Sequence, residues 1–140
     1  MRFFAKAFAA WAALLAAMSA NGLFRALVLV PWFGEHAARQ VSSIVGAAIV
    51  ITLAGVFVRR LPDPAHAPLL RVGLFWGLLT LAFEFGFGHY ASGIAWAELL
   101  ADYDVTAGRL WPFVLLATVT APSLWGAAVC GAAPHTRGAR

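Results

Sequence analysis

Residues 72–88 read VGLFWGLLTLAFEFGFG, and this stretch decides the fold class of the chain. Apart from Thr80 and Glu84, every residue in it is apolar or glycine. Extended back to Leu69, it is long enough to cross roughly 30 Å of hydrocarbon as a helix that rises 1.5 Å per residue. A carboxylate inside such a helix costs roughly 2.5–3.5 kcal/mol on insertion scales. Glu84 is therefore expected to face protein or water and to mark a functional site.

The composition of the whole chain agrees with a membrane protein. Of its 140 residues, 62% are hydrophobic and 11% are charged, and the mean hydropathy is +0.81. A soluble fold would expose large apolar patches with this composition, so we expect lipid to be the solvent for much of the surface. The net charge of +4 and pI of 10.2 would suit nucleic acid. The basic residues, however, lie at the ends of apolar runs, which indicates membrane topology instead.

Four apolar runs are long enough to span a bilayer, at about residues 7–30, 41–58, 69–88 and 110–130. The first also looks like a signal peptide, because Arg2 and Lys6 precede its apolar core. We interpret it as a retained span, since the apolar pattern resumes after Arg25. The sequence thus predicts an all-α integral membrane protein, a four-transmembrane-helix bundle that forms a single domain over residues 1–140.

The distribution of Lys and Arg predicts the orientation of these spans. Basic residues gather at the N-terminal end, in the connection between the second and third spans, and in the C-terminal tail: Arg2, Lys6, Arg59, Arg60, Arg71, Arg137 and Arg140. The other two connections carry one arginine each, alongside acidic residues: Arg39, Arg109, Glu35, Glu98, Asp102 and Asp104. The positive-inside rule then puts both termini in the cytoplasm, and we expect a bacterial inner membrane.

The connection before the fourth span carries a helical pattern of its own, at about residues 93–103. Its apolar residues recur at helical spacing, with acids on another face: Trp96, Leu99, Leu100 and Tyr103 against Glu98 and Asp102. This pattern is typical of a short amphipathic helix at the outer membrane surface.

Glu84 belongs to a stripe of small and polar residues. Gly73, Gly77, Thr80, Glu84 and Gly88 follow one another at intervals of three or four and share one helix face. Gly73 and Gly77 form a small-xxx-small pair, which favours close helix packing. We therefore expect Glu84 to point at protein, at a partner subunit or at a cavity.

Arg25 is the expected partner of Glu84. Both lie in the outer halves of their spans, and Asn21 shares a face with Arg25 because the two are four residues apart. An ion pair would remove most of the cost of both charges. The sequence predicts an outer-facing polar pocket with Glu84 and Arg25 at its floor. Other residues expected at this height are Gln40, Ser42, Ser43, His89, Tyr90 and Arg109.

Three interpretations of Glu84 and Arg25 stay open at this stage. Arg25 snorkels to the outer interface, the two residues form a purely structural pair, or they bind or move a solute. The last interpretation predicts an oligomeric transporter or channel-type protein, in which Glu84 binds a cation or proton.

Two other functional classes compete with transport. In one, the chain is an accessory subunit that docks on a larger membrane complex through Gly73, Gly77 and Thr80. In the other, it is a membrane-embedded enzyme that uses Glu84 and His89 as acid and base. Besides the bilayer, the expected partner is therefore a second copy or a membrane subunit, and not nucleic acid.

Motifs for metal and cofactor chemistry are missing. The single cysteine, Cys130, excludes an internal disulfide and any multi-cysteine redox or zinc site. The sequence has no His-Glu-x-x-His, Walker or Gly-x-Ser-x-Gly motif. Nothing in it places His36 and His89 opposite each other as haem ligands. We expect no cofactor and no bound metal.

Overall fold

The computed structural model describes residues 2–131, which form helices and connecting turns without a strand. Arg137 and Arg140, the arginines of the C-terminal tail that were used to predict the orientation, lie outside this range. Three helical stretches are long and apolar enough to cross a membrane: 2–59, 69–91 and 111–131. Many large apolar side chains on them face outward, as lipid contact requires: Leu23, Leu27, Trp32, Leu78 and Leu124 are examples. The all-α class and the membrane-type helices are thus confirmed.

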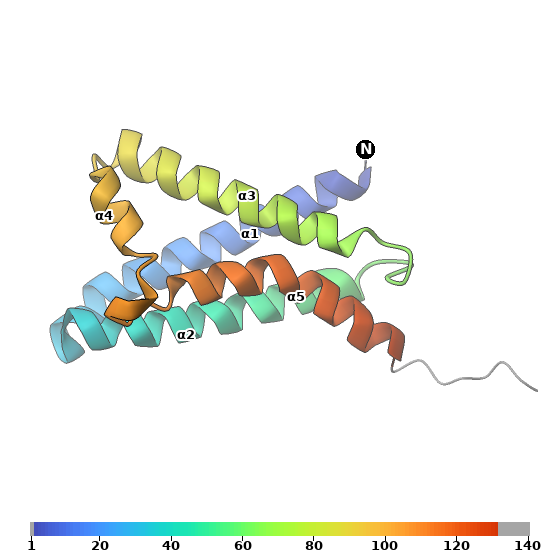
Figure 1. The fold of residues 1–140 in the computed structure, drawn as a ribbon. Coiled ribbons are helices and arrows are strands. Elements are labelled where there is room, and N and C mark those ends of the chain that lie inside the picture. Colours follow the sequence, from blue (N-terminus) through green and yellow to red (C-terminus); the bar gives the residue numbers. More distant parts are fainter. Residues whose placement is uncertain (1, 132–140) are drawn as a thin grey trace, which may run out of the picture.

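The first stretch consists of three elements and contains a reversal of the chain. Helix α1 (Arg2–Phe24) continues into the π-helical turn η1 (Arg25–Leu29) and then into α2 (Val30–Arg59). Gly34 interrupts the helical geometry with φ 76° and ψ 165°, a backbone conformation that glycine adopts without a Cβ penalty. Beyond this point the chain turns back, so α2 lies beside α1 and runs in the opposite direction (Figure 1).

The rest of the chain adds two long helices and a compact connection. Helix α3 (Leu69–Gly86) ends in the π-helical turn η2 (Phe87–Ala91). The connection that follows holds the short helix α4 (Trp96–Ala101) and the 3₁₀ turn η3 (Val105–Ala107), before α5 (Trp111–Gly131). The amphipathic helix expected over residues 93–103 is therefore only six residues long. Gly93, with φ 69°, precedes it, and a second turn around Gly108, with φ 74°, follows it.

The structure has two ends with different connections (Figure 1). At one end lie the start of α1, the loop of residues 60–68 and the last described turn of α5. At the other end lie the reversal between α1 and α2, and the connection that contains α4. We call these the loop end and the α4 end.

Close packing fills the interior toward the loop end. Trp76 is fully buried, and its Nε1 donates a 2.8 Å hydrogen bond to the backbone oxygen of Ala7 in α1. Around it packs an apolar core whose members come from all the long helices: Trp11, Ala54, Phe57, Val58, Val72 and Ala121. Glycines let these helices approach, since a Cβ on Gly73 would overlap the backbone oxygen of Val119 in α5. The contacts of this core fix the positions of the long helices relative to one another.

Candidate functional site

A cavity of about 290 Å³ opens between the helices toward the α4 end. Its inner part is lined by buried apolar side chains, among them Leu14, Val50 and Val114, together with Leu15, Met18 and Leu115. Its outer part is lined by four charged side chains that are each about one-third exposed, Arg25, Arg39, Asp102 and Arg109, and by Glu84. The cavity therefore runs from a charged, partly exposed mouth to a buried floor that is mostly apolar, with the buried polar residues Asn21, Ser42 and Thr118 also in its lining.

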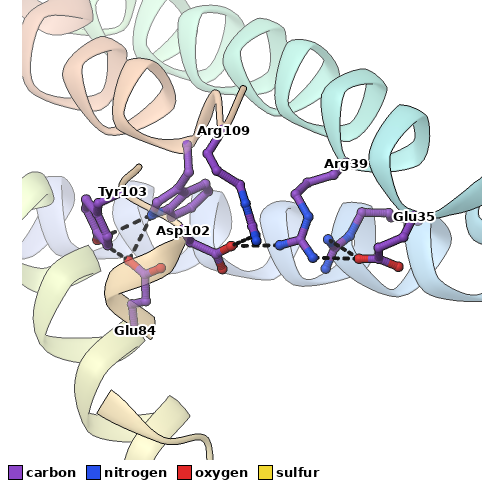
Figure 2. Close-up of polar contacts among 8 residues, drawn as sticks. Glu35, Arg39, Glu84, Asp102, Tyr103 and Arg109 are labelled. Atoms are coloured by element: carbon purple, nitrogen blue, oxygen red, sulfur yellow. Dashed lines mark hydrogen bonds and ion pairs between the residues drawn. The ribbon is translucent and has the colours of Figure 1, made fainter. Parts of the chain in front are cut away.

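Glu84 is held at this cavity by two uncharged donors. Its Oε2 accepts a 2.5 Å hydrogen bond from the Tyr103 hydroxyl and a 2.9 Å hydrogen bond from Trp111 Nε1. Figure 2 shows Glu84 beside Tyr103 at the edge of the polar network. No Lys, Arg or His within residues 2–131 forms an ion pair with it. The carboxyl group thus has hydrogen-bond donors in the described chain, but no counter-ion.

Tyr103 remains a hydrogen-bond donor across the physiological pH range. Burial raises the pKa of its hydroxyl well above the ordinary value, and the hydrogen bond to Glu84 raises it further. The hydroxyl also accepts from Trp111 Nε1 at 3.3 Å, which acts in the opposite direction. These three side chains form a closed triangle that connects the last turns of α3 with the residues before and at the start of α5.

A chain of alternating charges crosses the mouth of the cavity (Figure 2). Arg39 bridges two acids, with Nη2 2.6 Å from Glu35 Oε1 and Nη1 2.7 Å from Asp102 Oδ1. Arg109 binds the same oxygen of Asp102. Arg25 lies at the other end, with Nη1 3.7 Å from Glu35 Oε1. Three guanidinium groups therefore share two carboxylates, and together they connect the α1–α2 reversal to the connection before α5.

The predicted ion pair between Arg25 and Glu84 is not formed. Both side chains line the cavity, but the nearest acid to Arg25 is Glu35. The reason is the reversal of the chain at Gly34. Glu35 follows directly after this reversal and is thereby brought close to Arg25 in η1. Glu84 is instead occupied by Tyr103 and Trp111.

Other predicted site residues also reach this cavity. Asn21 is buried and its Nδ2 donates to the backbone oxygen and Oγ of Ser42, at 2.9 and 3.0 Å. Ser43 and Thr80 contribute to the lining, and Thr80 Oγ1 accepts a 3.2 Å hydrogen bond from Trp11 Nε1. The structure thus brings Asn21, Ser43 and Thr80 to the cavity that Arg25 and Glu84 line.

His89 and Tyr90 lie away from the cavity. His89 Nδ1 is 2.9 Å from the backbone oxygen of Ile94, and its ring stacks on Trp96 at 4.1 Å between centroids. Tyr90 is 81% exposed. His89 and Tyr90 follow Glu84 by five and six residues, and with 3.6 residues per helical turn these positions lie on other sides of the helix than Glu84. The suggested acid–base pair of Glu84 and His89 is consequently not assembled.

The predicted packing residues meet elements of the same chain. Gly73 and Gly77 face Val119 of α5, and Gly88 faces Leu99 of α4. A partner subunit therefore cannot dock on the Gly73 and Gly77 face in this arrangement, because α5 already covers it.

Sequence reasoning missed the residues that hold Glu84. The sequence pattern puts Tyr103 on the apolar face of a surface helix, and it indicates an interface anchor for Trp111, which lies near the start of the fourth apolar run. One local signal would have helped. Asp102 and Tyr103 precede the Asp104–Gly108 turn, and Arg109 and Trp111 follow it, so a tight reversal there brings the two pairs together.

The assembled site can bind a small molecule through complementary groups. It offers an accessible carboxyl group, an arginine-rich cluster and an apolar floor within one cavity. Such a mixture of convergent polar groups and apolar walls is typical of ligand pockets. Comparison of the chain with protein-family models, with curated proteins and with solved structures finds no match.

Proposed function

We propose that this chain is a small membrane protein of the transport class that binds a solute in the cavity beside Glu84. The observation that carries the proposal is the cavity itself, because it joins a partly exposed, charged mouth to a buried, mostly apolar floor. A protein that served only as a structural spacer would gain stability by filling this volume, since voids forfeit packing contacts.

The proposal includes four membrane crossings with both termini in the cytoplasm. A straight helix over residues 2–59 would be about 87 Å long, far more than the roughly 30 Å hydrocarbon core. The reversal at Gly34 supports two antiparallel crossings within this stretch. Arg2, Lys6, Arg59 and Arg60 belong to elements that meet at the loop end, which supports a cytoplasmic position for that end (Figure 1). The cavity then opens toward the outer face.

The packing favours a carrier over an open channel. Below the cavity floor, the fully buried Trp76 and its neighbours Trp11 and Ala54 occupy the interior. Within residues 2–131 the cavity lining stops before these side chains. Transfer of a solute to the other face would therefore need a rearrangement of the helices around a bound solute. Assembly into a homo-oligomer stays a prediction, which the mass of the purified protein in mild detergent tests.

A flux experiment tests the proposal. Proteoliposomes filled with a pH-sensitive dye are challenged with a panel of inorganic cations, amines, amino acids and organic acids. We expect at least one solute to evoke a signal that Glu84→Gln and Leu115→Trp abolish. Leu115 lines the cavity, so a tryptophan there fills it.

The matched control is the next residue along α5. Leu116 is 57% exposed on the outside, so Leu116→Trp should retain the flux while placing the same bulky ring in the same helix. If no solute evokes flux beyond protein-free liposomes, or if Leu115→Trp transports as well as Leu116→Trp, the cavity is not a transport site.

A further inference from the structure

Glu84 has no counter-ion in the described part of the chain, residues 2–131. Its Oε2 accepts hydrogen bonds from the Tyr103 hydroxyl and from Trp111 Nε1, and both donors are uncharged. Within the same residues no hydrogen bond reaches Oε1, and the side chain lines the cavity. A carboxylate inside a membrane helix is expensive without a positive partner, and its oxygens only accept hydrogen bonds. The ligand group that fits at Oε1 is therefore a cationic donor.

The positive charges of the cavity lie beyond Asp102 and are engaged by other acids. Arg39 and Arg109 both bind Asp102, and the third guanidinium group of the lining pairs with Glu35. Figure 2 shows Asp102 between Glu84 and the guanidinium groups of Arg39 and Arg109. A cation at Glu84 is thus separated from these guanidinium groups by a second carboxylate, which reduces their repulsion.

The groups beside Glu84 favour an ammonium group over a metal ion. A metal such as Ca²⁺ takes roughly six to eight oxygen ligands. Within residues 2–131 no three His, Cys, Asp or Glu side chains gather to hold a metal, and the neighbours of Glu84 direct O–H and N–H donors at it. An ammonium group needs only acceptors, and a carboxylate oxygen gives it a charge-assisted hydrogen bond.

An apolar wall begins close to the carboxyl group, on the inward side of Trp111. Val114 and Leu115 follow Trp111 by three and four residues in α5, so their Cβ atoms lie about 5–6 Å from its Cβ. Both side chains line the cavity. Trp111 itself is hydrogen-bonded to Glu84 at 2.9 Å, so the wall starts about one helical turn inward of the residue that holds the carboxyl group.

The size of the cavity limits the apolar part of the ligand. Leu14, Leu15 and Met18 of α1 complete the apolar lining. The volume of about 290 Å³ lies at the small end of the roughly 300–1,000 Å³ that ligand pockets occupy. A compact aliphatic group fits this space, whereas a large ring system does not.

Resting on the proposal that this cavity is a solute site, we infer that its ligand is a small lipophilic amine. The ammonium group binds Glu84 Oε1 and supplies the missing counter-ion, and the aliphatic body lies against Val114 and Leu115. An organic anion would find its positive partners only at the partly exposed mouth, where the guanidinium groups already have acids. An inorganic cation would leave the apolar wall without a partner.

Four matched probes test this inference on the purified protein in detergent at neutral pH. The first, 3-methylbutylamine, carries both the ammonium group and the body. The others are 3-methylbutan-1-ol, which lacks the charge, 4-methylpentanoate, which reverses it, and methylammonium, which lacks the body. Binding is measured by calorimetry, and titrations of protein-free micelles give the partition of each probe into detergent.

We expect 3-methylbutylamine to bind at least about tenfold more tightly than each other probe, a difference of about 1.4 kcal/mol. Equal binding of the alcohol would show that the carboxylate does not select the ligand, and equal binding of methylammonium would show that the apolar wall does not. Either result overturns the inference. Tighter binding of 4-methylpentanoate also overturns it, because the arginines would then hold the ligand.

Two variants of the site, each with a matched control, locate the bound amine. Glu84→Gln should reduce the affinity for 3-methylbutylamine to that for the alcohol, whereas Glu98→Gln, which neutralises an exposed acid outside the cavity lining, should not. Leu115→Trp should weaken the amine and the alcohol alike, whereas Leu116→Trp should weaken neither. An amine preference that survives Glu84→Gln, in a variant whose size-exclusion profile matches wild type, contradicts the assignment.

The binding and flux experiments fail independently. Selective amine binding without any flux in proteoliposomes would leave the ligand class intact and remove the transport proposal. Flux of another solute that Leu115→Trp abolishes, without selective amine binding, would do the reverse.

Discussion

The two ends of the bundle are built on opposite principles. Toward the loop end, glycines and aromatic rings fill the interior and Trp76 is fully enclosed, while Arg59 stacks over the ring of Trp125. Toward the α4 end, a cavity separates the helices and a chain of ion pairs crosses its mouth. Close packing holds the first region, whereas directional polar contacts hold the second.

This difference assigns separate tasks to the two regions. A packed interior transmits strain and tolerates little change of volume, so the loop end determines the positions of the helices. Partly exposed ion pairs are individually weak, so the α4 end can rearrange at small cost. A site that must admit and release a ligand is better built from the second kind of contact.

The largest expected effect comes from closing the helix contact at Gly73. Gly73→Ala places a Cβ against the backbone oxygen of Val119, which cannot move without shifting α5. We expect a loss of stability of about 3 kcal/mol, at the upper end of overpacking effects. Thermal unfolding in detergent measures the loss.

Gly86→Ala is the matched control, because its Cβ would meet no neighbouring atom within 4 Å. In that helical position alanine should stabilise the protein by about 0.5–1 kcal/mol. If Gly73→Ala behaves like Gly86→Ala, close packing between α3 and α5 does not hold the loop end together.

A smaller effect is expected when the polar cluster at the α4 end is broken. Asp102→Asn removes the carboxylate that Arg39 and Arg109 share. Since the Asp102 side chain is 34% exposed, we expect a loss of only about 1 kcal/mol, and less at high salt because screening weakens the pairs. Unfolding at low and high ionic strength measures both quantities.

Asp63→Asn provides the comparison for Asp102. Asp63 pairs with His66 in the loop of residues 60–68, where both side chains are well exposed. Its substitution should change stability by less than about 0.5 kcal/mol. A loss for Asp102→Asn that is no larger than this, or that does not depend on salt, would show that the ion pairs contribute nothing to the α4 end.

The smallest effect is a pH dependence at Asp104. The hydroxyl of Thr106 lowers the pKa of this carboxyl group, and the backbone N–H groups of Thr106 and Ala107 lower it further. Because the folded pKa is below the unfolded one, the contribution to stability is present above about pH 4 and is lost as the pH falls through the folded value.

Melting temperatures of wild type and Asp104→Ala should therefore differ slightly at neutral pH and converge in acid. Asp104→Asn keeps an oxygen acceptor for the turn but does not titrate in this range. A difference between wild type and Asp104→Ala that does not shrink at all on acidification would show that the carboxylate charge is not what stabilises the turn.

Much of the helical architecture follows from local patterns in the sequence. The apolar runs predicted helices in the right places, because burial in lipid forces backbone groups to bond within each segment. The reversal near residue 34 and the connection before α5 were also expected, since charged residues and turn-forming residues gather there. The members of the small-residue stripe around Glu84 recur at helical spacing; Gly73 and Gly77 contact α5, and Thr80 and Glu84 line the cavity.

The partners of each charged group were not predictable in the same way. The sequence predicts a similar height in the membrane for Arg25 and Glu84. In the structure, however, Arg25 lies nearest to Glu35, and Glu84 accepts hydrogen bonds from Tyr103 and Trp111. Height is set by hydropathy, but the choice of partner depends on the direction of two turns, at Gly34 and between Asp104 and Gly108. The backbone conformation of those turns decides which acid meets which base.

The sequence by itself determined the helical class, the approximate helix positions and the inward face of Glu84, because each depends on contacts that repeat along one helix. Only the tertiary structure decided that a cavity opens beside Glu84, that uncharged donors hold its carboxyl group, and that the arginines gather around other acids. Those features join residues far apart in the chain, and their energies depend on a geometry that no single segment specifies.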